Sequence, residues 1–182
     1  MKYKVIALIG KAGSGKDFTM KKALSEKPLE LNEIVSCTTR PKREGEVDGV
    51  NYHFITPETF SQRLLDGLML EATLFNNWAY GTAWDALRIN DINIGVFNPA
   101  GIDALLENKN IDLKVFYIYA DDKVRLMRQL NREKNPNCKE IVRRFQTDEK
   151  DFAFLDFDYT LLSNNGFKDL QKNVDIILGA FD

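Results

Sequence analysis

The segment that most constrains the fold of this 182-residue chain lies near its start, where a short apolar run is followed by a glycine-rich stretch. The run Val5-Ile6-Ala7-Leu8-Ile9 is typical of a strand that is buried on both faces of a parallel sheet. The apolar residues Phe18, Ala23 and Leu24 then follow helical spacing. The order of strand, glycine-rich turn and helix predicts an α/β fold with a mainly parallel sheet flanked by helices.

The glycine-rich stretch Gly10-Lys11-Ala12-Gly13-Ser14-Gly15-Lys16 fits the pattern G-x-x-x-x-G-K of phosphate-binding loops. Glycines let main-chain N–H groups converge on phosphate oxygens, and the start of the helix adds partial positive charge. We expect all seven residues to bind ATP, with Lys16 as a catalytic charge at the β- and γ-phosphates. The alternative is a glycine-rich turn without a ligand, which the position between a strand and a helix disfavours.

The residue after this loop departs from the usual pattern. Asp17 stands where a Ser or Thr hydroxyl normally reaches Mg²⁺. A carboxylate at this position can still bind the metal, directly or through water. We therefore expect Asp17 to belong to the ATP site and to be the metal ligand of the chain.

The rest of the chain continues the α/β rhythm with two interruptions. Apolar runs predict strands at residues 92–97, 115–119 and 159–162, and helical spacing predicts helices at 100–107, 121–132 and 167–178. The rhythm breaks between about residues 36 and 88, where Val47-Asp48-Gly49-Val50 predicts a hairpin turn. A second break, between residues 132 and 144, contains Asn135-Pro136-Asn137 and has the chemistry of a loop.

From these boundaries we expect one domain over residues 1–182. Its core would comprise residues 1–35 and 89–182, an inserted lobe about residues 36–88, and a lid about residues 132–147. A chain of this length buries one sizeable core more readily than two.

Composition limits which partners the chain can bind and which kinds of site it can form. The formal net charge is only −2, so the chain lacks the overall positive field that holds nucleic acid. No apolar run is long enough to span a bilayer and no signal peptide is evident, so we expect a cytoplasmic protein that is a monomer or a homodimer. Cys37 and Cys138 are too isolated for a disulfide framework or a zinc site, and His53 is the only histidine.

The segment from Ser36 to Phe54 gathers arginines and a tyrosine around tight turns. Arginine suits a phosphate dianion because its planar fork forms paired charge-assisted bonds, and a tyrosine hydroxyl adds a neutral donor. By itself the segment could equally be a solvated basic loop. Glu71 and the run Tyr80-Gly81-Thr82 follow it, and they complete a larger pattern.

That pattern resembles guanylate kinases, whose motif Ser-x-Thr-Thr-Arg-x-x-Arg-x-Gly-Glu-x-x-Gly-x-x-Tyr-x-Phe is matched at every fixed position from Ser36 to Phe54. The resemblance implies that a phosphate-binding set holds GMP, namely Arg40, Arg43, Tyr52 and Tyr80. It implies a guanine-binding set of Ser36, Glu71 and Thr82, to which we add Asn98 as a GMP contact. A glutamate suits guanine, because a carboxylate can accept from both N1–H and the exocyclic amine.

The resemblance extends to the end of the chain, where Phe157-Asp158-Tyr159 is similar to the last strand of the family. It implies that Arg132 and Arg144 join Lys16 and Arg40 as catalytic cations, and that Arg128 lies near the adenine of ATP. Arg143 could replace Arg144, because by this resemblance the lid is one residue longer than usual. The alternative for these lid arginines is a place on a solvent-facing helix.

The implied reaction is transfer of the γ-phosphoryl group of ATP to GMP or dGMP, with Mg²⁺ as cofactor. Such transfer relies on positioning and charge neutralisation, so no general base is required. Ribose 1,5-bisphosphate phosphokinases are an alternative, because they can carry Asp and Asn where this chain has Asp17 and Asn98. A kinase of several deoxynucleoside monophosphates and a phosphopeptide-binding scaffold domain are further alternatives.

The residues at positions 17 and 98 lead to one further hypothesis. Guanylate kinases keep an acidic residue where Asn98 stands and a neutral one where Asp17 stands, so the two charges look exchanged. Both residues should lie at the carboxyl end of the sheet. Asp17 could then replace the missing carboxylate at the metal, whereas independent drift at two tolerant positions is the alternative.

Overall fold

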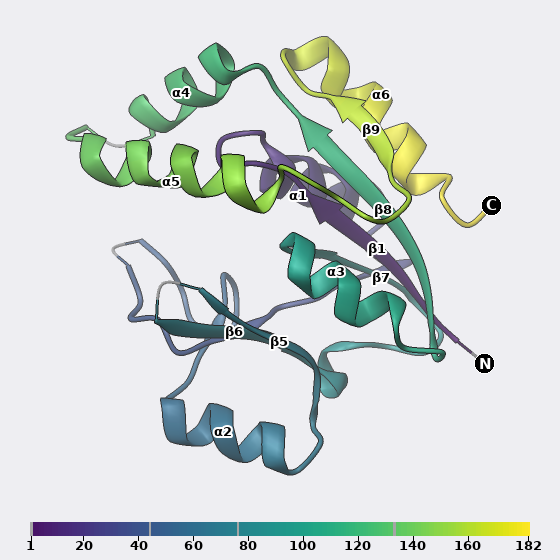
Figure 1. Ribbon diagram of the computed structural model, residues 1–182. Helices are drawn as coiled ribbons and strands as arrows, with labels where there is room; N and C mark the ends of the chain where they lie inside the picture. The colour runs from purple at the N-terminus through teal and green to yellow at the C-terminus, as the bar shows by residue number, and fades with distance from the viewer. Residues whose placement is uncertain (1, 44, 76, 133) are drawn as a thin grey trace. The chain divides into compact units, whose positions relative to one another are not determined.

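The computed structural model describes residues 2–43, 45–75, 77–132 and 134–182, and Figure 1 shows its helices and strands. The main sheet has five strands in the order β2-β7-β1-β8-β9. These strands are β1 (Tyr3–Ile9), β2 (Leu31–Glu33), β7 (Ile92–Val96), β8 (Ile111–Tyr119) and β9 (Thr160–Ser163). β2 pairs with β7 in parallel, and β8 pairs with β9 in parallel. The predicted α/β class with a mainly parallel sheet is confirmed.

The chain divides into two compact units. The first comprises Met1–Val5, Leu29–Gly95 and Ala100–Leu113, and the second comprises Ile6–Pro28, Val96–Pro99 and Lys114–Asp182. The proposed lobe at about residues 36–88 falls in the first unit, and the proposed lid at about residues 132–147 falls in the second.

The first unit carries a second sheet of four strands in the order β4-β3-β6-β5. Its elements are β3 (Cys37–Thr38), β4 (His53–Phe54), α2 (Pro57–Leu65), β5 (Met69–Phe75), β6 (Trp78–Ala83) and the short helix η1 (Trp84–Ala86), followed after β7 by α3 (Pro99–Leu106). Helix α2 begins where sequence rules place it, because the Thr56 side chain accepts from the Thr59 N–H and proline occupies the first turn. In Figure 1 this helix lies alongside β5 and β6.

The predicted hairpin at Val47–Val50 is only partly present. The turn itself forms, with Gly49 at a φ of 76° and its N–H donating to Tyr52 O. The strand that follows, β4, pairs with β3 in parallel, so the prediction of an antiparallel hairpin here is wrong. The reason is that the segment continues past the turn alongside β3, where His53 N–H donates to Ser36 O; the antiparallel pair of this unit is β5 with β6.

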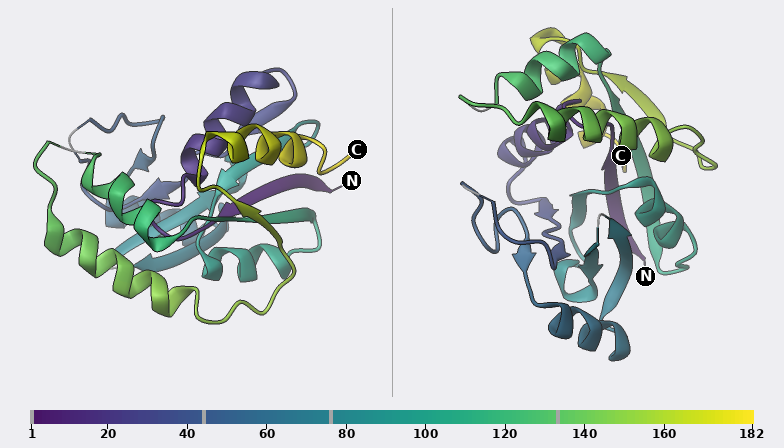
Figure 2. Two further views of the ribbon diagram at one scale, coloured as in Figure 1. Left: turned by 90° about the horizontal axis from the view of Figure 1, so that it is seen from above. Right: turned by 60° about the vertical axis from the view of Figure 1, so that its left-hand side comes forward.

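The second unit contains the amino-terminal loop and four helices, α1 (Lys16–Glu26), α4 (Asp122–Leu130), α5 (Cys138–Asp151) and α6 (Phe167–Leu178). Helices α1 and α6 contact each other, and Figures 1 and 2 show them side by side. Ile6, Leu8 and Ile118 are almost fully buried in the strands, and Val174 and Ile177 are buried on α6. The apolar run that opened the sequence is therefore core.

Helix α5 occupies a region where the sequence indicated a loop. The interruption after α4 ends at Asn137, whose side chain accepts from the Glu140 N–H and caps the helix. Ile141, one turn further on, is buried. The loop prediction for residues 132–144 is therefore wrong from residue 138 onward, because a good cap follows the Asn-Pro-Asn turn.

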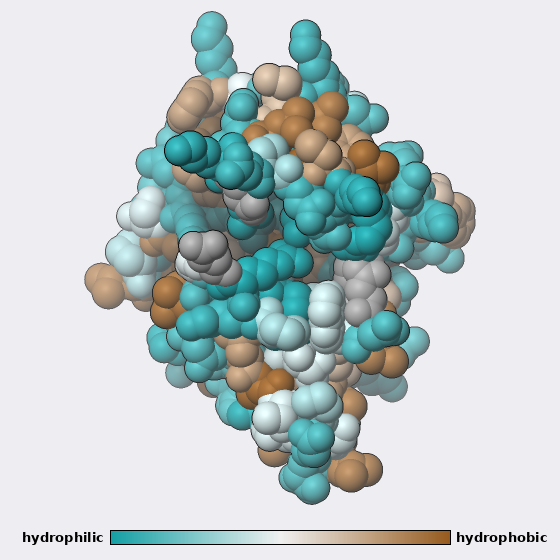
Figure 3. Space-filling view, turned by 90° about the vertical axis from the view of Figure 1, so that its left-hand side faces the viewer, coloured by the Kyte–Doolittle hydropathy of each residue, from teal (hydrophilic) through white to brown (hydrophobic). Residues whose placement is uncertain are grey.

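The surface agrees with a chain of which 29% of residues are charged. Hydrophilic residues dominate the face shown in Figure 3, and apolar residues form scattered patches on it. Among the described residues no helix has both the length and the apolar character needed to cross a membrane. Both cysteines are free thiols, with Cys37 buried and Cys138 exposed.

Candidate active site

The predicted phosphate loop connects β1 to α1 in the second unit. Two of its glycines have left-handed backbones, with a φ of 80° at Gly13 and 93° at Gly15. A Cβ at Gly13 would lie 2.7 Å from Arg125 O, and one at Gly15 would lie 2.5 Å from Asn164 Nδ2. Only glycine fits both the backbone and the space. The loop turns sharply into α1, whose first N–H groups have no partners within the helix and can bind an anion.

Two side chains bind the carbonyl groups of this loop. Arg128 Nη1 donates to Ser14 O at 3.0 Å, and Asn164 Nδ2 donates to the same oxygen at 2.7 Å. The Ser14 carbonyl and the Gly15 N–H belong to one peptide plane and point in opposite directions. Holding the carbonyl on one side therefore turns the Gly15 N–H to the other side, where a phosphate oxygen can accept from it.

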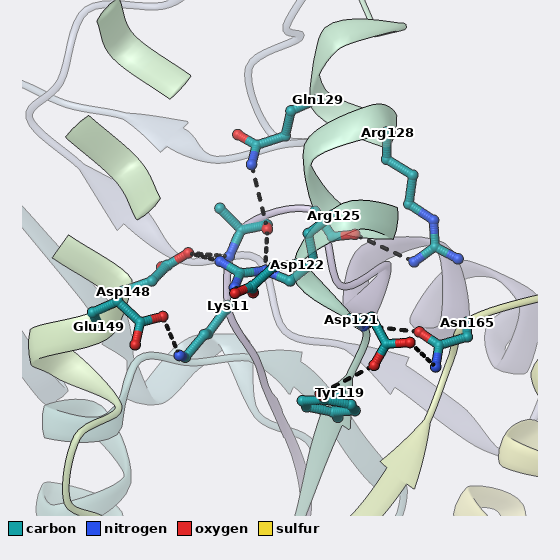
Figure 4. A network of polar contacts seen from close by, with 12 residues as sticks. Lys11, Tyr119, Asp121, Asp122, Arg125, Arg128, Gln129, Asp148, Glu149 and Asn165 are labelled. Carbon is teal, nitrogen blue, oxygen red and sulfur yellow. Dashed lines mark hydrogen bonds and ion pairs between the residues drawn. The ribbon is translucent and has the colours of Figure 1, made fainter. Parts of the chain in front are cut away.

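Helix α5 contacts the same loop from another direction, as Figure 4 shows. Lys11 Nζ forms an ion pair with Glu149 Oε1 at 2.5 Å, and the Ala12 N–H donates to Asp148 Oδ2 at 2.8 Å. Burial raises the pKa of Asp148, and the bond from Ala12 and the charge of Arg125 only partly offset this. These contacts were not predicted, because Asp148 and Glu149 lie far from the loop in sequence.

A cavity of about 250 Å³ adjoins the loop in the second unit. It is lined by Gly15, Phe18, Arg128, Asn164, Gly166, Phe167 and Leu170. The residues Phe18 and Phe167 are 58% and 87% exposed. Exposed rings beside an arginine form an apolar surface with a cationic edge, which suits a flat heteroaromatic base. Arg128 both lines this cavity and binds the loop, and its contact to adenine stays a prediction.

Two of the predicted lid arginines, Arg143 and Arg144, lie on α5. Arg143 Nε and Nη2 both donate to the Glu140 carboxylate, at 2.7 and 2.8 Å, and Arg144 Nε donates to it at 3.0 Å. The hydrogen bond from Arg143 is the main reason that the pKa of Glu140 is lowered to about 2; burial opposes it and Arg144 adds to it. Arg132 is exposed just beyond the end of α4. One carboxylate thus holds both Arg143 and Arg144.

In the first unit the predicted acceptor side chains gather around Arg40, which is only 4% exposed. Its guanidinium forms paired bonds with the Glu46 carboxylate at 2.9 and 2.8 Å. It lies 5.5 Å from the ring centres of both Tyr52 and Phe54, and it also bonds the Tyr80 hydroxyl. Tyr52 and Tyr80 themselves meet edge to face. Three predicted phosphate contacts therefore form one cluster.

Glu46 belongs to the quoted motif but was assigned no role. Burial acts to raise the pKa of Glu46, but the bonds from Arg40 and from the Arg43 N–H outweigh it and the pKa is lowered. The Arg43 N–H lies 2.8 Å from Glu46 Oε2. Glu46 thus fixes both predicted arginines, one through its side chain and the other through its backbone.

The three predicted guanine contacts also lie together. Glu71 on β5 is paired in register with Thr82 on β6, and the Ser36 and Thr82 hydroxyl oxygens are 3.3 Å apart. Glu71 is only 8% exposed, and its burial raises the pKa of the carboxyl although Thr82 donates to it. Tyr80 and Thr82 are two residues apart on β6, so they share one face of the sheet. Asn98, which follows β7, belongs to the second unit instead.

The fold and these groups first define a class, the nucleotide-binding proteins with a phosphate loop between a buried parallel strand and a helix. The family model for guanylate kinase matches residues 2–180. By that match the chain belongs to the guanylate kinase family.

Individual relatives agree with this assignment. The guanylate kinase of Clostridium perfringens strain SM101 is 32% identical over 181 residues, covering 97% of this chain and 82% of that protein. The guanylate kinase of Helicobacter pylori strain 26695 is 32% identical over 182 residues, covering 97% of this chain and 85% of the relative. The crystal structure of guanylate kinase from Anaplasma phagocytophilum has a similar fold, with a TM-score of 0.69, 18% identity, and coverage of 99% of this chain and 85% of that one.

Proposed function

We propose that this chain transfers the γ-phosphoryl group of ATP to GMP, giving GDP and ADP. The observation that carries the proposal is the buried Glu71, whose carboxylate bonds Thr82 beside Ser36. Burying a carboxylate is costly unless hydrogen-bond donors pair with it, and guanine offers two donors, N1–H and the exocyclic amine. Adenine offers an acceptor at N1 instead. Membership of the guanylate kinase family supports the same acceptor.

The acceptor phosphate would be bound by Arg40, Arg43, Tyr52 and Tyr80. Arg40 is already held in place by Glu46 and by the flanking rings, so little side-chain entropy is lost when a phosphate binds. A guanidinium and tyrosine hydroxyls are strong donors to a dianion. The first unit would thus supply groups for both ends of a mononucleotide. The cluster around Arg40 would bind its phosphate, and Ser36, Glu71 and Thr82 would bind its base.

The donor would be ATP, with its phosphates on the loop Gly10-Lys11-Ala12-Gly13-Ser14-Gly15-Lys16 and its adenine in the adjoining cavity. Arg128 belongs to both the phosphate loop site and the adenine cavity of this proposal, because it lines that cavity and donates to the Ser14 carbonyl. Lys16 begins α1, so its charge adds to the positive end of the helix. Arg132 and either Arg144 or Arg143 would add positive charge at the transferring group.

The residues near the loop fit a magnesium ion bound mainly by the nucleotide. The described residues contain no group of three or more His, Cys, Asp or Glu side chains that could form a metal cage. Nucleotide-bound Mg²⁺ needs none, since it usually keeps several waters and takes one or two carboxylates. Asp17, exposed in the first turn of α1, would provide one. When bound, the ion would neutralise charge on the β- and γ-phosphates.

Transfer itself needs little covalent help from the protein. The acceptor oxygen of GMP is already ionised near neutral pH, so the side chains have to position it and neutralise charge. Lys16 and the arginines would do this on the donor side, and Arg40 and Arg43 on the acceptor side. Water has to be kept from the γ-phosphoryl group, because hydrolysis is the competing reaction.

A coupled assay of ADP formation tests this proposal. It should compare GMP and dGMP with AMP, CMP, UMP and ribose 1,5-bisphosphate, each with ATP and Mg²⁺. We expect the highest kcat/KM with GMP or dGMP. The highest kcat/KM with ribose 1,5-bisphosphate would contradict the proposal, and so would comparable values for all the nucleotides. ATP binding without any transfer would indicate a binding domain.

A further inference from the structure

One arginine that the reaction does not use directly is buried beside the phosphate loop. Arg125 on α4 is only 1% exposed. Its guanidinium lies 4.4 Å from the centre of the Phe145 ring on α5 and forms an ion pair with Asp148 at 2.5 Å. Removing a guanidinium and a carboxylate from water carries a large desolvation cost before their attraction is counted. Apolar side chains could fill the same space at lower cost, so the ion pair calls for a specific explanation.

Both members of this pair, which are labelled in Figure 4, form hydrogen bonds with the same loop residue, Ala12. Arg125 Nε donates to the Ala12 carbonyl at 3.0 Å, and the Ala12 N–H donates to Asp148 Oδ2 at 2.8 Å. The two main-chain polar groups of Ala12 are therefore bound by opposite charges that also bind each other. Gln129 Nε2 adds a longer bond, 3.4 Å, to the same carbonyl.

This arrangement fixes the peptide planes on both sides of Ala12. The plane before it is held through the N–H and the plane after it through the C=O, so neither can rotate without breaking a charge-assisted bond. The next residue, Gly13, lies against the main chain of Arg125. The backbone of the loop is thus held in place just before the N–H groups that lead into α1.

We propose that Arg125 and Asp148 form a clamp that positions the phosphate loop for ATP. The proposal rests on the proposed function and adds two positioning residues to it. The clamp holds the loop in its binding shape before the nucleotide arrives, which lowers the ordering cost of binding. It also attaches α5 to the loop. Asp148 is four residues after Arg144 and therefore lies on the same face of the helix.

The decisive variant replaces the whole clamp by apolar residues, Arg125→Leu with Asp148→Leu. Buried ion pairs can often be replaced in this way without loss of stability. We expect a melting temperature close to that of the wild type, an ATP Kd at least about tenfold higher by titration calorimetry, and a GMP Kd within about twofold. In the assay the ATP KM should rise by a similar factor.

Two single variants refine the test. Asp148→Asn keeps the shape and an acceptor for Ala12 but removes the charge, and it should raise the ATP Kd by a smaller factor. Asp122→Asn is the matched control, because Asp122 pairs with the same Arg125 but its side chain is 73% exposed. It should leave the ATP Kd unchanged.

Unchanged ATP affinity in the folded double variant would overturn the clamp. If that variant does not fold, Asp148→Asn decides: an ATP Kd equal to that of the wild type overturns the proposal. An effect of Asp122→Asn as large as that of Asp148→Asn would also overturn it. Failure of the proposed function looks different, because the wild type would then not phosphorylate GMP.

Discussion

The phosphate loop differs from the acceptor cluster, which comprises the predicted phosphate contacts around Arg40 and the predicted guanine contacts. The difference is whether main-chain or side-chain groups would bind the ligand. In the proposed function the loop would bind phosphates mainly through main-chain N–H groups, and the side chains of Arg125, Arg128 and Asp148 bind the backbone around them. In the acceptor cluster the groups that would bind the ligand are side chains. They are held by other side chains, as Glu46 holds Arg40.

This difference predicts how each region should respond to substitution. A side-chain site loses one contact at a time, so its losses should be graded and confined to one substrate. A main-chain site loses its shape when one backbone angle changes, so its losses should be large and affect every reaction that uses ATP. The predictions below test this contrast, from the largest expected effect to the smallest.

Lys16→Ala should lower kcat with every acceptor by on the order of 10³-fold or more, because it removes the charge beside the transferring group. Its melting temperature should stay near that of the wild type, since the side chain is not part of the core. Steady-state kinetics and thermal unfolding check both statements. Lys21→Ala is the control, an exposed lysine on the same helix. Unchanged turnover in Lys16→Ala would exclude a catalytic role for the loop.

Gly13→Ala should raise the ATP KM by about 10²-fold, because a Cβ 2.7 Å from Arg125 O displaces the loop. Gly67→Ala separates this clash from backbone strain. Gly67 has a similar φ of 68°, but a Cβ there meets nothing within 4 Å. It should lower the free energy of unfolding by about 1–2 kcal/mol with the ATP KM unchanged. Equal kinetic effects of the two variants would mean that backbone strain, and not the clash with Arg125, impairs ATP binding.

Arg43→Ala should raise the GMP KM roughly 10- to 100-fold and change the ATP KM little, because one charge-assisted contact to the acceptor phosphate is lost. Initial rates with each substrate varied in turn measure both constants. Arg88→Ala is a suitable control, since the Arg88 side chain is 70% exposed and pairs only weakly with Asp91 at 3.6 Å. A loss confined to ATP would contradict the acceptor role of Arg43.

Glu71→Gln should lower the preference for GMP over AMP about tenfold or more, because a good bidentate base contact is worth about 1–3 kcal/mol. Burial raises the pKa of Glu71, so the wild-type carboxyl takes up a proton above its ordinary value of 4.5. As the pH falls through that raised pKa the acceptor is lost and the GMP KM should rise, whereas Glu71→Gln should lack this rise. An unaltered base preference would favour a sugar phosphate as acceptor.

The smallest effect is expected from Asp17 and Asn98. Asp17→Ser should weaken Mg²⁺-dependent turnover severalfold, and adding Asn98→Asp should restore part of it if both side chains serve one ion. Residues that share an ion should couple by about 0.5–3 kcal/mol in a double-mutant cycle. Simple addition of the two single effects would mean that the positions vary independently.

The sequence predicted the loop well because all its signals are contiguous. A buried strand, seven loop residues and a helix follow one another without interruption, and local rules are sufficient to interpret them. The acceptor cluster was predicted only through resemblance to a family, since Glu71 and Thr82 meet across two strands. Local rules carry no information on such pairing.

The residues that hold the loop could not have been predicted from the sequence. Arg125 and Asp148 looked like ordinary charged residues on helices, and they lie 113 and 136 positions from Ala12. That the side chain of Arg125 is only 1% exposed is a property of the folded chain alone. Residues 138–144 were interpreted as loop because Pro136 and two asparagines precede them, although one of those asparagines begins the helix.

The two cysteines differ in exposure, so one of them can be labelled selectively. Burial raises the pKa of the Cys37 thiol, which also accepts a bond from Arg63, so alkylating reagents should react with it slowly. Cys138 is exposed at the first residue of α5, the helix that carries Arg144 and Asp148. A fluorescent maleimide should therefore label the native chain at one end of α5 without any substitution. The emission of that dye would then report on α5 as nucleotides are added.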